Sequence, residues 1–192
     1  MEDPILKFKH CWQRACQDSP LRQKSAVCIS TINQDGFPEG RFVDLKALDE
    51  QGFVFCTNLD SSKGKHIQFN AKVAMSCWWD HIGLQVRVVG YAEPICEQAA
   101  TAFWQSRNKE AQMATLCCQQ SKELKSESQL FERFAAVSEK HTSAAIPKPS
   151  NWGGFVVRPV SIEFLTFRES RLHLRELFRL NDKQWQKSLL QP

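Results

Sequence analysis

Charged side chains interrupt a short apolar run between Arg41 and Lys46, and they are the first candidates for binding chemistry. Arg41, Asp44 and Lys46 stand where a strand would otherwise be apolar. Burying charge is costly unless it is paired or binds a ligand, so the run is either an exposed edge or the wall of a site. Arg41 and Lys46 lie an odd number of positions apart, and a regular strand would send them to opposite faces. Both can reach one ligand only if a β-bulge or the strand end intervenes.

The segment from Thr57 to Lys65 is the second candidate. It leads from a strand end through a hydroxyl-rich turn, with Ser61, into a helix that begins near Lys63. Free N–H groups, the positive end of the helix dipole, hydroxyl donors and lysines together suit a phosphate. Each charge-assisted hydrogen bond there would contribute about 1.5–3 kcal/mol. Ser and Thr at a helix start are also ordinary caps, which is the alternative interpretation.

The third candidate is the run from Arg171 to Arg175, where alternation would put Arg171, His173 and Arg175 on one strand face. Cationic groups stacked in this way repel one another unless an anion or polar ligand lies between them. His173 carries an imidazole, a group that can transfer a proton or donate a hydrogen bond. A solvated outer face is the alternative.

Composition restricts the class of protein. The chain has 192 residues, 24% charged and 42% hydrophobic, which is typical of a folded globular domain. We expect one domain over residues 1–192, without a secretory signal or an apolar run long enough to span a membrane, and a cytoplasmic location. The eight cysteines show no Cys-x-x-Cys or zinc-ligand spacing, so reduced thiols and no metal site are expected. A net charge of +4 without a basic stripe argues against nucleic-acid binding.

Short apolar runs at hairpin spacing must position these residues. The patterns predict strands over 26–32, 41–48, 53–58, 73–79, 84–95, 155–160, 161–167, 171–180 and around Trp185, with helices over 5–16, 63–70, 97–106 and 126–140. A turn is expected at 49–52 and a linker at 144–150. This alternation predicts an α+β fold, a six-to-eight-stranded antiparallel split β-barrel with flanking helices.

These segments, together with Gln85–Gly90, Gln120-Ser121 and Trp152–Phe155, resemble the pyridoxamine (pyridoxine) 5′-phosphate oxidase family. The resemblance is colinear from Asp3 to the C-terminus. It implies an FMN-binding split barrel, a homodimer with FMN at the subunit interface, and 150–192 as the dimerisation and substrate-site region. It also implies oxidation of pyridoxine or pyridoxamine 5′-phosphate to pyridoxal 5′-phosphate, with O2 as acceptor.

The resemblance assigns roles to individual residues. It implies FMN binding by Arg41, Lys46, Thr57, Ser61, Lys63, Gln85, Gln120, Ser121 and Arg175. It implies a phosphorylated small-molecule substrate held by Lys46, Phe103, Arg107, Ala111, Arg171 and His173, with Arg171 and His173 as the catalytic pair.

The chain also departs from the family pattern. Phe103 and Ala111 stand where the family usually has a tyrosine and a serine that bind the substrate phosphate, so two hydroxyl donors are missing. Leu165 replaces a tryptophan, Ser62 an arginine and Cys56 an aromatic residue. These departures leave two alternatives open: a flavin oxidase of the same family acting on another small substrate, such as a phenazine-type intermediate, and a non-catalytic flavin- or vitamer-binding module.

Overall fold

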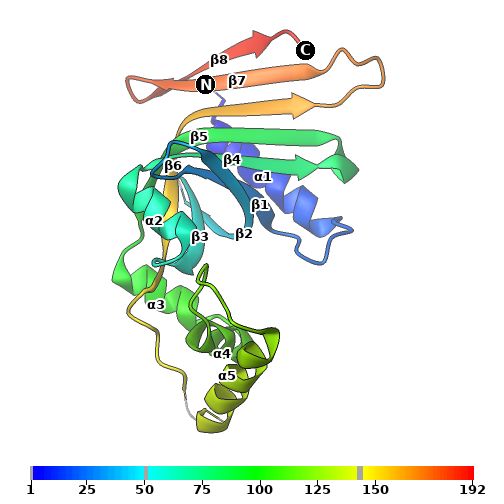
Figure 1. Cartoon of the computed structure of the whole chain (residues 1–192). Coiled ribbons are helices and arrows are strands. Elements are labelled where there is room, and N and C mark those ends of the chain that lie inside the picture. The colour runs from blue at the N-terminus through cyan, green and yellow to red at the C-terminus, as the bar shows by residue number, and fades with distance from the viewer. Residues whose placement is uncertain (1, 50–51, 142–144) are drawn as a thin grey trace.

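The computed structural model describes residues 2–49, 52–141 and 145–192 (Figure 1). The helices are α1 (Pro4–Gln17), α2 (Ser62–Phe69), α3 (Glu97–Gln105), α4 (Lys109–Cys117), α5 (Glu127–Lys140) and the 3-10 turn η1 (Asp80–Ile82). The strands are β1 (Ala26–Ile32), β2 (Pro38–Asp49), β3 (Gly52–Asn58), β4 (Lys72–Trp79), β5 (Leu84–Pro94), β6 (Trp152–Thr166), β7 (Leu174–Asn181) and β8 (Gln184–Leu190).

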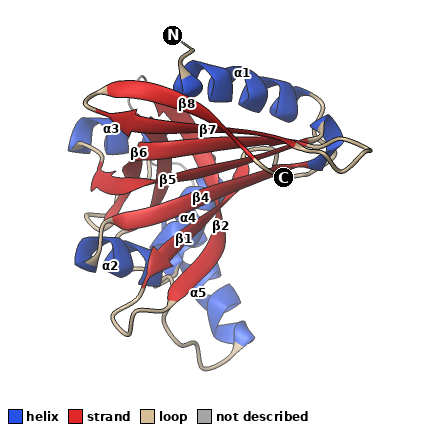
Figure 2. Cartoon of the chain, turned by 90° about the horizontal axis from the view of Figure 1, so that it is seen from above, coloured by secondary structure: helices blue, strands red, loops and turns tan. Residues whose placement is uncertain are grey.

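The strands form one antiparallel sheet in the order β3-β2-β1-β4-β5-β6-β7-β8. A further pairing between β3 and β6 closes the first six strands into a barrel, and β7 and β8 extend the sheet beyond β6 (Figure 2). Figure 1 shows this hairpin and the three helices α3–α5 at opposite ends of the molecule. The predicted α+β split barrel is confirmed.

The barrel core follows from alternating strand patterns and one amphipathic helix. Along β4 the residues alternate between exposed and buried, as expected when one face of a strand meets the core. α1 begins at the cap of Asp3, whose carboxylate accepts the Ile5 N–H at 2.8 Å. Its fully buried Phe8 lies edge-on to Phe53, with ring centroids 4.7 Å apart. Burying such a ring stabilises the fold by about 1.5–3 kcal/mol.

β6 is one strand of 15 residues, so the prediction of separate strands over 155–160 and 161–167 is wrong. Pro159 lies inside it, where a missing N–H would normally break the ladder. The register shifts there, because Val89 pairs with Ser161 and Gly90 pairs with Pro159. A Cβ on Gly90 would lie 2.1 Å from the carbonyl oxygen of Arg158, so the bulge requires glycine.

Two further differences concern one helix and the start of one strand. α4 was not predicted, although Asn108 caps it by accepting the Ala111 N–H at 2.8 Å. β7 begins at Leu174, three residues later than the predicted strand over 171–180. Residues 50, 51 and 144, which belong to the predicted turn and linker, lie outside the described residues. All eight cysteines are free thiols, as expected.

An ion-pair network joins α1 to the β7–β8 hairpin. Lys7 Nζ lies 2.7 Å from the Glu176 carboxylate, and Lys187 contacts both Glu176 and Glu2. Burial alone would raise the pKa of Glu176, but the hydrogen bonds from Lys187 and Lys7 outweigh it and hold the pKa below its ordinary value. The ionised carboxylate therefore stabilises the fold at neutral pH, and this contribution is lost as pH falls through the lowered pKa.

We expect Glu176→Gln to lower the free energy of unfolding at pH 7 by about 1–2 kcal/mol, because two lysines lose a shared partner. The variant should also lose less stability than the wild type on acidification from pH 7 to below 4.5, the ordinary pKa of the group. Urea unfolding at several pH values measures both effects. Glu93→Gln, which removes an exposed ion pair with Arg158, is the matched control and should change stability little. Equal acid sensitivity in wild type and Glu176→Gln would contradict the prediction.

Candidate functional site

A pocket of about 500 Å³ opens between β2, β3 and α4. Five of the predicted cofactor residues line it: Arg41, Lys46, Thr57, Lys63 and Gln120. Of the predicted substrate residues, Lys46, Arg107 and Ala111 line it. Four of the lining side chains are cationic, so the pocket suits an anionic ligand.

A bulge in β2 brings Arg41 and Lys46 to the same pocket. The register between β2 and β3 pairs Leu45 with Phe55 and Ala47 with Val54, which leaves Lys46 as the extra residue. The bulge offsets the odd spacing of Arg41 and Lys46, so both side chains can lie on the same side of the strand, as binding of one ligand requires. Lys46 Nζ lies 3.3 Å from the Asp44 carboxylate.

The N-terminus of α2 forms a polar corner beside the pocket. Ser61 caps the helix, because its hydroxyl accepts the Gly64 N–H at 3.3 Å. A Cβ on Gly64 would lie 2.2 Å from the carbonyl oxygen of Leu59, so only glycine allows this tight approach. The Thr57 hydroxyl, at the end of β3, donates to Gln120 Oε1 at 3.3 Å. The corner therefore joins β3, α2 and the loop after α4.

Lys63 is a buried cation without a carboxylate partner. It is 7% exposed, and its ammonium group donates to the hydroxyls of Thr57 at 3.2 Å and Ser61 at 3.4 Å. Burial, with a smaller contribution from the charge of Arg41, lowers the pKa of Lys63. No ion pair involves Lys63 within the described parts of the chain. A buried charge held only by neutral groups is costly, and an anion bound in the pocket would offset that cost.

Arg107 forms the other side of the pocket. Its guanidinium donates to the Ala111 carbonyl oxygen at 3.2 Å and to the Thr115 hydroxyl at 3.3 Å. It also lies over the ring of Trp152, 5.3 Å from the centroid. Its buried Nε has no hydrogen-bond partner, and burial lowers the pKa of the group. The side chain is held in place with donor capacity left over.

The remaining predicted residues near this end of the molecule lie around the pocket. Ser61 lies behind it and contacts Lys63. Ser121 follows Gln120 with a positive φ of 69°. Phe103 packs into a small apolar cluster with Trp104, which is not part of the pocket lining.

The C-terminal candidates do not share one strand face, so that prediction is wrong. The strand begins only at Leu174, and Arg171 lies in the preceding bend with a φ of 61°. His173 Nδ1 accepts the Arg168 N–H at 3.1 Å, and its ring stands edge-on to Phe167. The positive φ and the turn at this point end the alternation that the sequence pattern had extended back to Arg171.

Gln85 and Arg175 lie on a line across three strands. Gln85 pairs with Leu165, and Leu165 pairs with Arg175. The Arg175 guanidinium contacts the buried Glu163 carboxylate at 2.8 Å, and Arg87 contacts the same carboxylate at 2.8 Å. Neither these residues nor Arg171 and His173 line the pocket. Within one chain the predicted site residues therefore form two separate groups.

Sequence reasoning missed several lining residues. Thr115 was not singled out, although it lies one helical turn after Ala111 on α4 and brings a hydroxyl to the pocket. The i, i+4 spacing would have revealed it once α4 had been recognised. Asn58, which belongs to the candidate segment 57–65 but was not given a role of its own, also lines the pocket, as does Cys118, which was not assigned to the site.

The family comparison places the chain in a known family. The model described as pyridoxamine 5′-phosphate oxidase matches residues 14–143, and the model of the pyridoxine 5′-phosphate oxidase C-terminal dimerisation region matches residues 152–192. The chain belongs to the pyridoxamine 5′-phosphate oxidase family. The second match adds that its C-terminal strands correspond to a region of dimerisation.

Curated relatives match along the whole chain. A pyridoxine/pyridoxamine 5′-phosphate oxidase from Shewanella pealeana is 36% identical over 190 residues, which cover 99% of this chain and 89% of that enzyme. The enzyme of the same name from Hahella chejuensis is 38% identical and covers 100% of this chain and 90% of its own length.

Solved structures confirm the fold. PhzG from Burkholderia lata, in complex with tetrahydrophenazine-1-carboxylic acid, superposes with a TM-score of 0.92 at 25% identity, over 100% of this chain and 94% of that one. A pyridoxamine 5′-phosphate oxidase-related, FMN-binding protein from Nostoc punctiforme has a TM-score of 0.79 at 18% identity, over 100% and 98% of the two chains.

The family indicates a flavin, and the residues of the pocket fit its phosphate-bearing form. Lys63 is a buried cation that lacks an acidic partner, and Ser61 and Thr57 present hydroxyls beside it. The first turn of α2 adds N–H groups at the positive end of a helix dipole.

Among the described helices, none has the length and apolar character to cross a membrane.

We expect Lys63→Met to abolish the stabilisation of the protein by inorganic phosphate. Saturating phosphate should raise the Tm of the wild type by a few degrees, because it binds only the folded state. The variant should show no rise, and its Tm without phosphate should equal or exceed that of the wild type, since an unpaired buried charge is removed. Thermal scans with increasing phosphate measure both. Lys65→Met, on the exposed side of the same helix, is the control and should respond like wild type; an unchanged response in Lys63→Met would contradict the assignment.

Proposed function

We propose that this chain is an FMN-dependent oxidase that converts pyridoxine or pyridoxamine 5′-phosphate to pyridoxal 5′-phosphate with O2 as acceptor. The full-length similarity to enzymes of that name supports the substrate and the reaction. The FMN-binding relative with the same fold supports the cofactor. One observation carries the proposal: among the residues that the structure describes, Lys63 is buried without a carboxylate partner, in a pocket that Arg41, Lys46 and Arg107 also line.

The proposal assigns one group of pocket residues to the cofactor phosphate and another group to the substrate phosphate. Lys63, Ser61, Thr57 and Arg41 hold the FMN phosphate where the α2 N-terminus adds its dipole. When bound, FMN would supply the redox chemistry of the reaction, namely an acceptor for the hydride of the substrate carbon, with O2 as the final electron acceptor. Gln120 is held by its hydrogen bond from Thr57 and is available to the flavin from the side.

In this proposal Lys46 and Arg107, which also line the pocket, hold the substrate phosphate. Arg107 is suited to this, because it lines the pocket and its guanidinium is held by the Ala111 carbonyl oxygen, the Thr115 hydroxyl and the ring of Trp152. A guanidinium that is already oriented loses less conformational entropy on binding an anion than a mobile one. Lys46 contributes a point charge from the bulge of β2.

We infer that a second copy of the chain completes each site. Gln85, Ser121, Arg171, His173 and Arg175 are all implied by the family pattern, yet Gln85 and the C-terminal three lie away from the pocket of their own chain. The match of residues 152–192 to a dimerisation region supports their delivery to a partner's pocket. In that position Arg171 and His173 would lie over the substrate ring, where His173 can hold or move a proton.

The proposal is tested on the purified protein reconstituted with FMN. We expect a flavin absorption spectrum that persists after removal of free FMN, and stoichiometric hydrogen peroxide on aerobic addition of either phosphorylated vitamer. His173→Asn should lower kcat by about a hundredfold or more if the imidazole moves a proton. Protein that binds FMN but yields no peroxide with either vitamer would refute the vitamer assignment and leave a binding module or another substrate.

A second candidate is oxidation of a different small acid. The similarity to PhzG in complex with tetrahydrophenazine-1-carboxylic acid favours it, together with the hydroxyl groups missing at Phe103 and Ala111. A carboxylate needs fewer donors than a phosphate.

The double variant Phe103→Tyr, Ala111→Ser separates the two candidates. If the natural substrate is a phosphorylated vitamer, we expect the variant to improve kcat/KM for it by at most about tenfold, the worth of one added hydrogen bond to a charged group. If the natural substrate is another acid, vitamer turnover should rise by about a hundredfold. Steady-state peroxide assays with both enzymes measure the ratio. Thr101→Ser, a conservative change at a half-buried position of α3 that does not line the pocket, serves as the control.

A further inference from the structure

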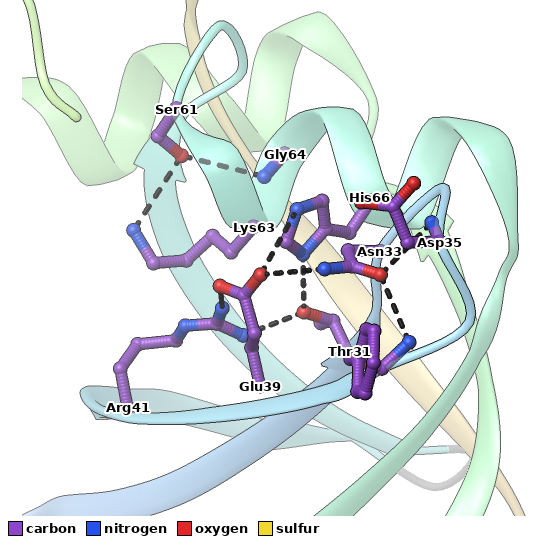
Figure 3. Close-up of polar contacts among 10 residues, drawn as sticks. Thr31, Asn33, Asp35, Glu39, Arg41, Ser61, Lys63, Gly64 and His66 are labelled. Atoms are coloured by element: carbon purple, nitrogen blue, oxygen red, sulfur yellow. Dashed lines mark hydrogen bonds and ion pairs between the residues drawn. The ribbon is translucent and has the colours of Figure 1, made fainter. Parts of the chain in front are cut away.

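A closed group of polar side chains joins the β1–β2 hairpin to α2, behind the pocket. Figure 3 shows Thr31, Glu39, Arg41 and His66 pointing toward one another. Arg41 donates through Nη1 to the Thr31 hydroxyl and through Nη2 to Glu39 at 3.2 Å. His66 Nδ1 lies 3.0 Å from the same Thr31 hydroxyl, and its Nε2 lies 3.9 Å from the Glu39 carboxylate. None of the site assignments above includes His66, Thr31 or Glu39.

The hydrogen-bond capacity of Thr31 sets the direction of these contacts. A hydroxyl has one proton to give and can accept others, and the Arg41 guanidinium can only donate. The Thr31 oxygen therefore accepts from Arg41, and its own proton is free to be donated to His66 Nδ1. Thr31 is fully buried, so a hydroxyl proton without an acceptor would be costly there. His66 is the acceptor that satisfies it.

Glu39 is fixed from the opposite side. Its carboxylate accepts from Asn33 Nδ2 at 3.1 Å, and the Asn33 side-chain oxygen accepts the N–H groups of Asp35 and Phe37 at 3.0 and 2.9 Å (Figure 3). The hairpin turn thus orients Asn33, and Asn33 orients Glu39. Glu39 in turn holds one edge of the Arg41 guanidinium.

Arg41 keeps donors for a ligand despite these contacts. A guanidinium has five N–H donors, and its Nη1 and Nη2 contacts use two. Arg41 lines the pocket and its charge contributes to the lowered pKa of Lys63, so the two cations lie near each other. Lys63 is carried by the first turn of α2 and His66 by the next. The contact of His66 with Thr31 therefore sets Arg41 and the α2 N-terminus relative to each other.

We propose that His66 is a positioning residue for the cofactor phosphate. By accepting a hydrogen bond from the Thr31 hydroxyl, it fixes Arg41 and the N-terminus of α2 relative to each other, so that both can bind the same phosphate group. The inference deepens the proposed function and rests on it. His66 does not touch the ligand. Its effect on binding is exerted through Thr31 and Arg41, and it is confined to the phosphate end of the cofactor.

The test compares two substitutions of His66, one that keeps a hydrogen-bond acceptor and one that keeps the side-chain volume. His66→Asn keeps an acceptor oxygen near the position of Nδ1 but fills less space, whereas His66→Leu fills the space and has no acceptor. We expect His66→Leu to raise the Kd for FMN about tenfold, and His66→Asn to raise it less than about threefold. Riboflavin, which lacks the phosphate, should bind all three proteins equally. Quenching of flavin fluorescence on binding measures every Kd without turnover.

Two further variants sharpen the test. Thr31→Val removes the hydroxyl at constant shape and should weaken FMN binding as His66→Leu does, and the double variant should be no weaker than either one. His81→Asn is the matched control, because His81 contacts the Ala15 carbonyl oxygen in the last turn of α1 and its substitution should leave the Kd unchanged. Thermal unfolding of each variant verifies that it is folded.

The outcomes separate the inference from the proposed function. Wild-type protein that binds no FMN overturns both. Wild type that binds FMN, with His66→Leu binding equally well, overturns the positioning role alone. The positioning role is also overturned if His66→Asn binds FMN more weakly than His66→Leu, because a packing defect alone would give that order. It is overturned as well if the affinity for riboflavin falls as much as the affinity for FMN.

Discussion

The cost of burying Lys63 is the constraint on which the rest of this site depends. Its ammonium group is 7% exposed and is held by two hydroxyls rather than by a carboxylate. Neutral partners do not recover the solvation that a charge loses on burial, so the folded chain carries an unfavourable term that only an anion can remove. The architecture maintains that arrangement. The β3–β6 pairing fixes the strand end that carries Thr57, and the absence of a side chain at Gly64 lets α2 begin close to the strand.

In the C-terminal strands, one buried carboxylate interacts with two cationic side chains. Glu163 is buried between Arg87 and Arg175, so one carboxylate orients two guanidinium groups that come from different strands. Arg175 is therefore pre-oriented before any ligand arrives, with Gln85 two strands away on the same register line through Leu165. A partner chain or its ligand would meet a rigid polar edge there, not a mobile one.

The sequence was most informative where local pattern and tertiary structure agree. Alternating apolar residues located the strands. The odd spacing of Arg41 and Lys46 required a bulge or a strand end if both were to reach one ligand, and β2 contains such a bulge. It failed where a local exception overrides periodicity. The predicted boundary between residues 160 and 161 does not exist, because a bulge at Gly90 lets β6 continue through Pro159. Alternation from Arg171 to Arg175 suggested one face, yet the positive φ of Arg171 keeps it outside the strand. The contact of His66 with Thr31 joins elements that are distant in sequence, so no local pattern could indicate it.

The departures at Phe103 and Ala111 have different structural weight. Phe103 packs among apolar side chains next to Trp104, away from the pocket lining, so a hydroxyl there would first have to reach past its neighbours. Ala111 lines the pocket, and one turn further along α4 the Thr115 hydroxyl lines it too. That hydroxyl donates to the Ala111 carbonyl oxygen at 2.8 Å and accepts from Arg107. A ligand that drew Arg107 away would release an acceptor on Thr115, and one that bound Thr115 would have to replace the Ala111 contact. Under the proposed function, selectivity for the anionic group of the substrate would therefore depend on Arg107 and Thr115 together, because the two side chains share a hydrogen bond.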